Sequence, residues 1–375
     1  MSYAQIIGWG YAVPSRIMTN HDLEKMVDTS DEWIRTRTGI SERRIAGPKD
    51  TTGTLAIRAA QNALQVADLS PSKVDLIIVA TCTPDHPMPA VASMVQDGLG
   101  ASRAGAFDLN AACSGFVYAL SVASGLIAGG LHERILVIGA DTMSRLVDWS
   151  DRSTCILFGD GAGAVLLQRS ESPTGLRAAV LGSDGSGLSS LYIPAGGSRL
   201  PLTPELVQNR RNCITMKGSE VYRFAVNAVT HATNQALSAA GLSIDDVDLF
   251  IPHQANIRII QSAAKSLKIP PEKVYSNVQH YGNTSAASIP MALCEAVEEG
   301  RVHAGANLAI VGFGAGLSWG AAVVQWGVDT TPVPFSWWKS VVRNFRRREA
   351  VVRSFALRTQ RRLDALRRMN GINEA

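Results

Sequence analysis

Short apolar runs alternate along residues 1–328 with longer segments in which apolar residues recur every three or four positions. The runs at 76–80, 135–139 and 308–311 contain no polar side chain. That pattern is typical of strands that are covered on both faces. The segments between them have the spacing of helices with one buried side. The chain therefore predicts an α/β protein built in layers.

An internal repeat divides this pattern in two. Residues 63–76 and 236–249 both read Ala-Leu-x-x-Ala-x-Leu-Ser-x-x-x-Val-Asp-Leu. The alignment that places residue 63 on residue 236, called the repeat register below, also superimposes 134–139 on 307–312 and Asn110 on Asn283. We predict two duplicated halves, residues 1–173 and 174–329, that pack as one five-layer αβαβα body. A functional site is expected where the halves meet.

The uncharged stretch from Leu109 to Leu131 is long enough to cross a bilayer. It also contains an asparagine, a cysteine, three serines and four glycines, which favours a buried helix of a layered protein. The N-terminus lacks a basic region followed by a long apolar run. We therefore expect a cytoplasmic protein.

Charge sets residues 330–375 apart from the rest. The segment 331–375 holds eleven Lys and Arg against three Asp and Glu, which leaves 25 basic and 29 acidic residues elsewhere. Apolar residues of this tail recur at helical steps, and they are Trp338, Val341, Val342, Phe345, Val352, Phe355, Leu363 and Leu366. We predict a basic amphipathic helix that packs on the body or a partner subunit, or contacts an anionic membrane or an acidic carrier protein. No motif for nucleic-acid binding accompanies it.

Composition excludes other classes. With 46% hydrophobic and 18% charged residues the chain does not read as intrinsically disordered. Its five cysteines include no CxxC pair, so we expect neither a disulfide scaffold nor a metal site.

Cys113 is the first candidate for chemistry, because it precedes a predicted helix. Unpaired amides and the helix dipole at that position favour a thiolate. His253 follows a predicted strand, and Asn283 corresponds by the repeat to a position near Cys113. The three together favour acyl-thioester chemistry at the junction of the halves.

Seven motifs occur in this order: Thr29-Ser-Asp-Glu-Trp33-Ile-Arg-Thr-Arg37-Thr-Gly39-Ile, Ala112-Cys113-Ser-Gly115-Phe, Asp151-Arg152-Ser-Thr, Phe158-Gly-Asp-Gly-Ala-Gly163-Ala, His253-Gln-Ala-Asn256, Gly282-Asn283-Thr-Ser and Gly312-Phe-Gly-Ala315-Gly-Leu-Ser-Trp319-Gly. With them, residues 1 to about 328 resemble β-ketoacyl-acyl-carrier-protein synthase III, of the thiolase-like condensing enzymes. The resemblance implies that an acyl-CoA acylates Cys113. A malonyl-acyl-carrier protein then loses carbon dioxide, and its enolate attacks the acyl group to give a 3-oxoacyl product.

The resemblance also implies roles for single residues. His253 and Asn283 stabilise the enolate, and the amides of Cys113 and Ala315 form the oxyanion hole, although the family usually has glycine at position 315. The remaining implied roles are CoA binding by Trp33, Arg37, Arg152 and Asn256, carrier-protein docking by Arg258 and closure of the acyl pocket by Met88. A homodimer without a resident cofactor or metal is expected.

Three alternatives stay open. The run Gly159-Asp-Gly-Ala-Gly-Ala164 partly resembles a dinucleotide fingerprint, but residues 155–158 and 164–167 predict a strand on either side of it, where the fingerprint requires a following helix. A condensing enzyme of specialised metabolism would use Cys113 with another donor or acceptor, for a polyketide starter or a ketone. An inactive scaffold would have no chemical need for Cys113, His253 and Asn283 together.

Overall fold

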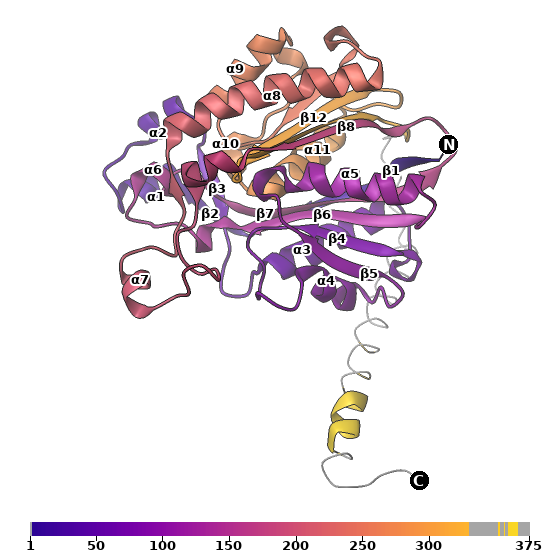
Figure 1. The fold of residues 1–375 in the computed structure, drawn as a ribbon, viewed down its shortest axis with the longest axis horizontal. Coiled ribbons are helices and arrows are strands. Elements are labelled where there is room, and N and C mark those ends of the chain that lie inside the picture. The colour runs from indigo at the N-terminus through magenta and orange to yellow at the C-terminus, as the bar shows by residue number, and fades with distance from the viewer. Residues whose placement is uncertain (1, 330–351, 353–355, 357–358, 367–375) are drawn as a thin grey trace.

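The computed structural model describes residues 2–329, 352, 356 and 359–366. Two main β-sheets lie one above the other, with helices on both faces of each (Figure 1). The first sheet has the order β1 (Tyr3–Ala12), β7 (Asp160–Ser170), β6 (Arg134–Thr142), β4 (Leu76–Ala80) and β5 (Gly105–Leu109). The second has the order β11 (Leu249–Pro252), β12 (Asn307–Gly314), β13 (Ser318–Gln325) and β8 (Gly175–Ser183).

Helices cover the sheets in layers (Figure 1). The outer face of the first sheet packs against α3 (Thr52–Val66) and α4 (Val91–Leu99). Between the sheets lie α5 (Gly115–Ala128) and α11 (Ser288–Glu298), and the outer face of the second sheet packs against α8 (Gly218–Ala240) and α9 (Ile257–Leu267). The smaller elements are α1 (Asn20–Glu24), α2 (Asp31–Thr38), α6 (Arg152–Cys155), α7 (Pro204–Gln208), α10 (Val278–Tyr281), β2 (Arg16–Thr19), β3 (Glu42–Ile45), β9 (Leu191–Tyr192) and β10 (Thr215–Met216). The prediction of a mixed α/β protein is confirmed.

The innermost elements explain the uncharged stretches of the sequence. All five residues of β4 are buried, because helices cover both faces of its sheet. The helix α5, which carries no charged residue, lies between the two sheets, where an ionised side chain would lack water and partners. It spans 14 residues of the stretch that begins at Leu109. Within the described residues no helix has the length and apolarity needed to cross a membrane.

The repeat register relates the bounds of elements as well as the letters of the sequence. It carries the start of β4 to that of β11, and the start of β6 to that of β12. The strands β1-β7-β6-β4 and β8-β13-β12-β11 follow the same order in their sheets. In the place of β5 the second sheet has an isolated parallel bridge between Phe250 and Val274.

Glycine lets the second half approach the first sheet closely. A Cβ atom at Gly139 of β6 would lie 2.1 Å from the carbonyl oxygen of Ala286, and one at Gly163 of β7 would lie 2.6 Å from the amide nitrogen of Met291. Side chains larger than hydrogen at these positions would push α11 and the loop before it away from the sheet. That loop carries Asn283.

Two details differ from the sequence interpretation. Residues 155–158 do not form a strand, because α6 extends to Cys155, and the glycine-rich run 159–164 lies almost entirely within β7. The run is neither a turn nor the start of a helix, so the dinucleotide fingerprint fails on geometry.

Part of the basic tail is described. Residues 359–366 are helical (Figure 1). Val352, Leu363 and Leu366 are 65%, 52% and 54% exposed. The other apolar residues of the predicted stripe, Trp338, Val341, Val342, Phe345 and Phe355, lie outside the described residues.

Candidate active site

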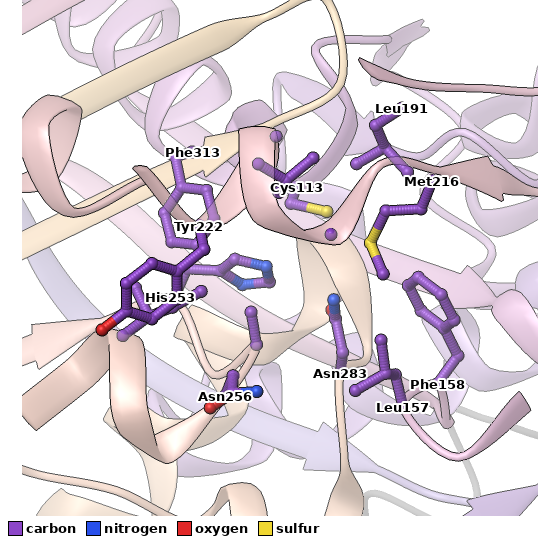
Figure 2. A pocket seen from close by; sticks show the side chains of 15 residues that line it. Cys113, Leu157, Phe158, Leu191, Met216, Tyr222, His253, Asn256, Asn283 and Phe313 are labelled. Carbon is purple, nitrogen blue, oxygen red and sulfur yellow. The ribbon is translucent and has the colours of Figure 1, made fainter. Parts of the chain in front are cut away.

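Cys113, His253 and Asn283 line one cavity of about 130 Å³ (Figure 2). Cys113 lies in a single 3-10 turn, η2 (Ala112–Ser114), directly before α5. His253 follows β11, and Asn283 precedes η7 (Ser285–Ala287), which continues into α11. The rest of the lining is mainly apolar and includes Leu157, Phe158, Leu191, Met216, Val221, Tyr222, Ile259 and Phe313. The repeat predicted that Cys113 and Asn283 lie close together, and the structure brings both of them to one cavity with His253.

The turn that carries Cys113 is held by short-range contacts. Ala112 has φ +47°, and its amide donates to the side-chain oxygen of Asn110 at 3.1 Å. The end of β12 passes directly beside the nucleophile, because a Cβ atom at Gly314 would lie 2.8 Å from the amide nitrogen of Cys113. Cys113 itself is 5% exposed. A substrate carbonyl can therefore reach the sulfur only through the cavity.

Burial works against the thiolate that the start of the helix favours. It raises the pKa of the Cys113 thiol to about 12, and the negative charge of Asp141 acts in the same direction. A hydrogen bond with the Ser285 hydroxyl lowers that pKa. The thiol is thus the resting form, and the expectation of an activated thiolate from the dipole alone is too simple.

Backbone contacts and one turn fix the Asn283 amide. The amide of Gly159 donates to the Asn283 carbonyl at 3.0 Å, and the Asn283 amide donates to the carbonyl of Leu157 at 2.8 Å. The side-chain oxygen of Asn283 accepts from the Ser285 amide at 2.9 Å. With that oxygen held, the side-chain nitrogen is the end available to a ligand in the cavity (Figure 2).

Burial keeps His253 neutral, and Ser288 contacts one nitrogen of its ring. Burial lowers its pKa to about 3, so the ring carries no charge near neutral pH. Its Nδ1 lies 2.6 Å from Ser288 Oγ, and that oxygen also accepts from the backbone amide of Gln254 at 3.4 Å. Since the amide can only donate, the Ser288 hydroxyl proton is free to point at Nδ1. When the hydroxyl donates to Nδ1, the ring proton resides on Nε2, the other ring nitrogen.

Trp33, Arg37 and Arg152 form a cluster on the surface side of the site. Ser30 caps α2 by accepting from the Trp33 amide at 3.1 Å. The Arg152 guanidinium lies 4.8 Å from the centre of the Trp33 ring, and that of Arg37 lies 5.8 Å away. Trp33 and Arg37 are four residues apart and lie on the same face of α2. The Arg152 guanidinium thus covers the Trp33 ring, and the two side chains are predicted to bind an adenine between them.

Asn256 and Arg258 lie at the start of α9, beside the cavity. Asn256 lines the cavity, caps α9 and donates to the Arg37 carbonyl at 3.1 Å. Arg258 is exposed, and its guanidinium lies 5.9 Å from the centre of the ring of Tyr222, a lining residue. Asn256 thus lines the cavity that contains Cys113, and Arg258 lies beside one of its lining residues.

Neither Met88 nor Ala315 is among the residues that line the cavity, although their predicted roles place both of them there. Met88 is 85% exposed and is not among the lining residues, so it does not close the cavity of its own chain. The carbonyl of Ala315 accepts from Ser318 Oγ at 2.9 Å, and its neighbour Gly314 lines the cavity instead. Within the described residues no group of three His, Cys, Asp or Glu is arranged to hold a metal ion.

The sequence interpretation missed Ser285, Ser288 and Asp141. Asp141 is fully buried and accepts hydrogen bonds from both Thr81 and Thr83 side chains and from the Ala286 amide at 3.0 Å. The repeat could have indicated Ser285, because it aligns this residue with Ala112, which directly precedes Cys113. Ser288 and Asp141 had no comparable signal.

Comparison with known proteins gives a consistent result. Two family models match, "3-Oxoacyl-[acyl-carrier-protein (ACP)] synthase III" over residues 107–185 and its C-terminal counterpart over residues 237–326. The beta-ketoacyl-[acyl-carrier-protein] synthase III of Symbiobacterium thermophilum is 55% identical over 322 residues, which cover 86% of this chain and 98% of that protein.

Solved structures extend the comparison. The 3-oxoacyl-[acyl-carrier-protein] synthase III of Aquifex aeolicus is 47% identical with a TM-score of 0.81, over 86% of this chain and all of that one. The priming β-ketosynthase of the R1128 polyketide pathway is 37% identical with a TM-score of 0.82, over 88% and 97% of the two chains.

Proposed function

The chain belongs to the 3-oxoacyl-[acyl-carrier-protein] synthase III family, and from this membership we propose how its residues divide the reaction. The enzyme is an acyltransferase that condenses an acyl-CoA with malonyl-acyl-carrier protein. The products are a 3-oxoacyl-acyl-carrier protein, CoA and carbon dioxide, and the reaction initiates fatty acid synthesis. No metal or cofactor takes part in the steps proposed below.

In the first half-reaction Cys113 takes the acyl group. The Cys113 thiol loses its proton and its sulfur attacks the thioester carbonyl, whose oxygen gains negative charge. The bond to the CoA sulfur then breaks as the carbonyl re-forms, and the CoA sulfur takes up a proton as CoA leaves. We assign the oxyanion to the amides of Cys113 and Ala315. The close passage of β12 at Gly314 supports this assignment, because it brings the end of that strand to the Cys113 amide.

In the second half-reaction His253 and Asn283 stabilise an enolate. Loss of carbon dioxide from the malonyl thioester leaves an electron pair on carbon and negative charge on the thioester oxygen. His253 Nε2–H and the Asn283 amide nitrogen donate to that oxygen without gaining charge. The enolate carbon then attacks the acyl carbonyl, a carbon–carbon bond forms, and the Cys113 thiolate leaves.

The observation that carries this assignment is the presence of Cys113, His253 and Asn283 on one buried, mostly apolar cavity. The test is intact-mass spectrometry after incubation with a mixture of acyl-CoAs. An adduct on Cys113 is expected, and its mass gives the accepted chain length. Subsequent addition of malonyl-acyl-carrier protein is expected to discharge the adduct. Absence of any adduct would contradict the proposal.

Trp33 and Arg152 are proposed to bind the adenine of CoA, with Arg37 and Asn256 along the channel. For the adenine to bind between them, the Arg152 guanidinium has to move away from the Trp33 ring.

We expect Trp33→Ala to raise the KM for acyl-CoA about tenfold, because stacking on an aromatic face is worth about 1–3 kcal/mol. The kcat is expected to stay unchanged, since Trp33 is not among the residues that line the cavity with Cys113. Trp33→Phe keeps an aromatic face and should show a smaller rise; an unaltered KM in Trp33→Ala would exclude the clamp.

Arg258 and Met88 are assigned to macromolecular contacts. The exposure of Arg258 at the mouth of the cavity supports its role in docking the acidic carrier protein. Met88, at 85% exposure, meets an acyl chain only if a second copy of the chain places it there. Its pocket role therefore depends on the predicted homodimer. A cytoplasmic location also stays a prediction.

The bounds of the two halves, residues 1–173 and 174–329, are also proposed. The shared strand order of the two sheets and the repeat register support a duplicated αβαβα body. The junction falls between β7 and β8, which end and begin at Ser170 and Gly175.

A priming role in polyketide synthesis is the second candidate. The R1128 priming β-ketosynthase supports it at 37% identity, against 55% for the synthase III of Symbiobacterium thermophilum. Both candidates acylate Cys113, so the carrier protein separates them. Turnover with a polyketide carrier and none with the fatty acid carrier would favour the second.

Residues 330–375 are proposed to dock on an anionic membrane or on the carrier protein. Eleven Lys and Arg in the segment and the exposure of Leu363 and Leu366 support docking. We expect deletion of 330–375 either to abolish binding to anionic vesicles or to raise the KM for malonyl-acyl-carrier protein, with unchanged kcat. Vesicles of neutral lipid and measurements at high salt are the controls. If neither quantity changes, the docking role is wrong.

A further inference from the structure

Asp141 is a fully buried carboxylate of β6 that the steps proposed above do not use. Its Oδ1 oxygen accepts four hydrogen bonds of 2.9–3.1 Å, from the hydroxyls of Thr81 and Thr83 and from the backbone amides of Cys82 and Thr83. Its Oδ2 oxygen accepts one at 3.0 Å from the backbone amide of Ala286. Since Ala286 is far along the chain, this carboxylate ties the first sheet to a turn of the second half.

That turn orients the side chain of Asn283. Ala286 lies in η7, and the residue before it, Ser285, donates its amide to the Asn283 side-chain oxygen at 2.9 Å. Ser285 has φ +53°, a conformation that residues with a side chain rarely adopt. Such a conformation persists only where the surroundings hold it. The bond from Asp141 to Ala286 holds the chain one residue beyond this point.

The repeat register gives this bond a counterpart at the nucleophile. It aligns Ala286 with Cys113, and Asp141 with Gly314. A Cβ atom at Gly314 would lie 2.8 Å from the Cys113 amide nitrogen. Position 314 therefore faces the amide of Cys113 just as position 141 faces the amide of Ala286.

A second pair of glycines supports the equivalence of the two places. The repeat register aligns Gly139 with Gly312. A Cβ atom at Gly139 would lie 2.1 Å from the carbonyl oxygen of Ala286, and one at Gly312 would lie 3.3 Å from that of Cys113. The same backbone arrangement thus occurs twice. One copy binds a carboxylate of the protein, and the other has glycine where that carboxylate would be.

We propose that Asp141 is a positioning residue for decarboxylation, because it binds the Ala286 amide and so holds the turn that directs the Asn283 side-chain nitrogen into the cavity. The Cys113 amide stays open for the oxygen of the substrate, since Gly314 has no side chain to bind it. This inference rests on the role proposed above for Asn283.

Asp141→Asn tests the contact with Ala286. The asparagine oxygen is expected to face the four donors at Oδ1, which places its NH₂ group against the Ala286 amide, where two donors cannot bond. We expect decarboxylation of malonyl-acyl-carrier protein to fall about 10- to 100-fold, less than the loss of the Asn283 donor itself. The rate of acyl-Cys113 formation is not expected to fall, because the negative charge of Asp141 raises the pKa of that thiol and the variant removes it.

Two further measurements separate positioning from a general loss of structure. Thr81→Val removes a donor from Oδ1 and leaves the Ala286 contact, so it should decarboxylate like the wild type. In an Asn283→Ala background, Asp141→Asn is expected to cost no further decarboxylation, because its effect passes through that amide.

Asp141→Ala provides a variant that can be rescued. It removes the carboxylate and leaves space for a small free one, so added formate is expected to restore part of the decarboxylation rate. Chloride at the same ionic strength is the control and should restore none.

Three results would overturn the inference. The first is wild-type decarboxylation in Asp141→Asn. The second is an equal loss of both half-reactions in that variant. The third is that neither Asp141 variant folds, with or without formate, which identifies a residue of the fold alone. The role of Asn283 is tested separately, since wild-type decarboxylation in Asn283→Ala would remove it whatever the Asp141 variants do.

Discussion

Cys113→Ala is expected to abolish the acyl adduct and to reduce condensation on the order of 10⁴-fold or more, because removal of a covalent nucleophile leaves only binding and charge stabilisation. His253 and Asn283 remain in this variant, and neither depends on the sulfur for its hydrogen bonds. The variant should therefore still decarboxylate malonyl-acyl-carrier protein and release acetyl-acyl-carrier protein. Intact-mass spectrometry of enzyme and carrier protein measures both results.

The matched control is Cys294→Ala. Cys294 is fully buried in α11 and lies outside the cavity lining, so its replacement removes a sulfur from the core without touching the reaction. We expect normal acylation in that variant, with at most a lower melting temperature. An acyl adduct that survives in Cys113→Ala, or disappears equally in Cys294→Ala, would contradict the assignment of the nucleophile.

The sequence predicts the innermost parts of this fold well, for a physical reason. A strand such as β4 is buried at every position, and a helix such as α5 lies between two sheets, so both must be apolar throughout. The repeat adds long-range information, because its register maps Asn110 on Asn283. That mapping placed Cys113 and Asn283 together before any contact was known.

Other features depend on packing that no local pattern contains. The pKa of Cys113 reflects its depth and the charge of Asp141, and neither is visible in the residues around the cysteine. Ser288 holds His253 across 35 residues of sequence. The exposure of Met88 is likewise a property of the loop after β4 in three dimensions. The prediction of a strand and a turn at residues 155–164 is wrong for another reason. The small residues there suggest a turn, but within β7 they allow α11 to pack closely against the strand.

Asn283 gives the second large effect, and it concerns the other half-reaction. Asn283→Ala is expected to slow decarboxylation of malonyl-acyl-carrier protein about 10²- to 10³-fold, the usual cost of removing one oxyanion donor. Acylation of Cys113 should proceed, because the attacking sulfur does not need this amide. Release of carbon dioxide and formation of the acyl adduct, measured separately, give the two rates.

Asn283→Asp separates the donor from the turn. Aspartate keeps an oxygen that accepts from the Ser285 amide, so the 2.9 Å contact can persist. It lacks the NH₂ group and adds a negative charge beside the developing enolate, so decarboxylation should fall at least as far as in Asn283→Ala. If Asn283→Asp instead kept the wild-type rate, the residue would serve only the turn, and His253 would have to stabilise the enolate alone. Because burial keeps that ring neutral, a single uncharged donor would then carry the whole decarboxylation.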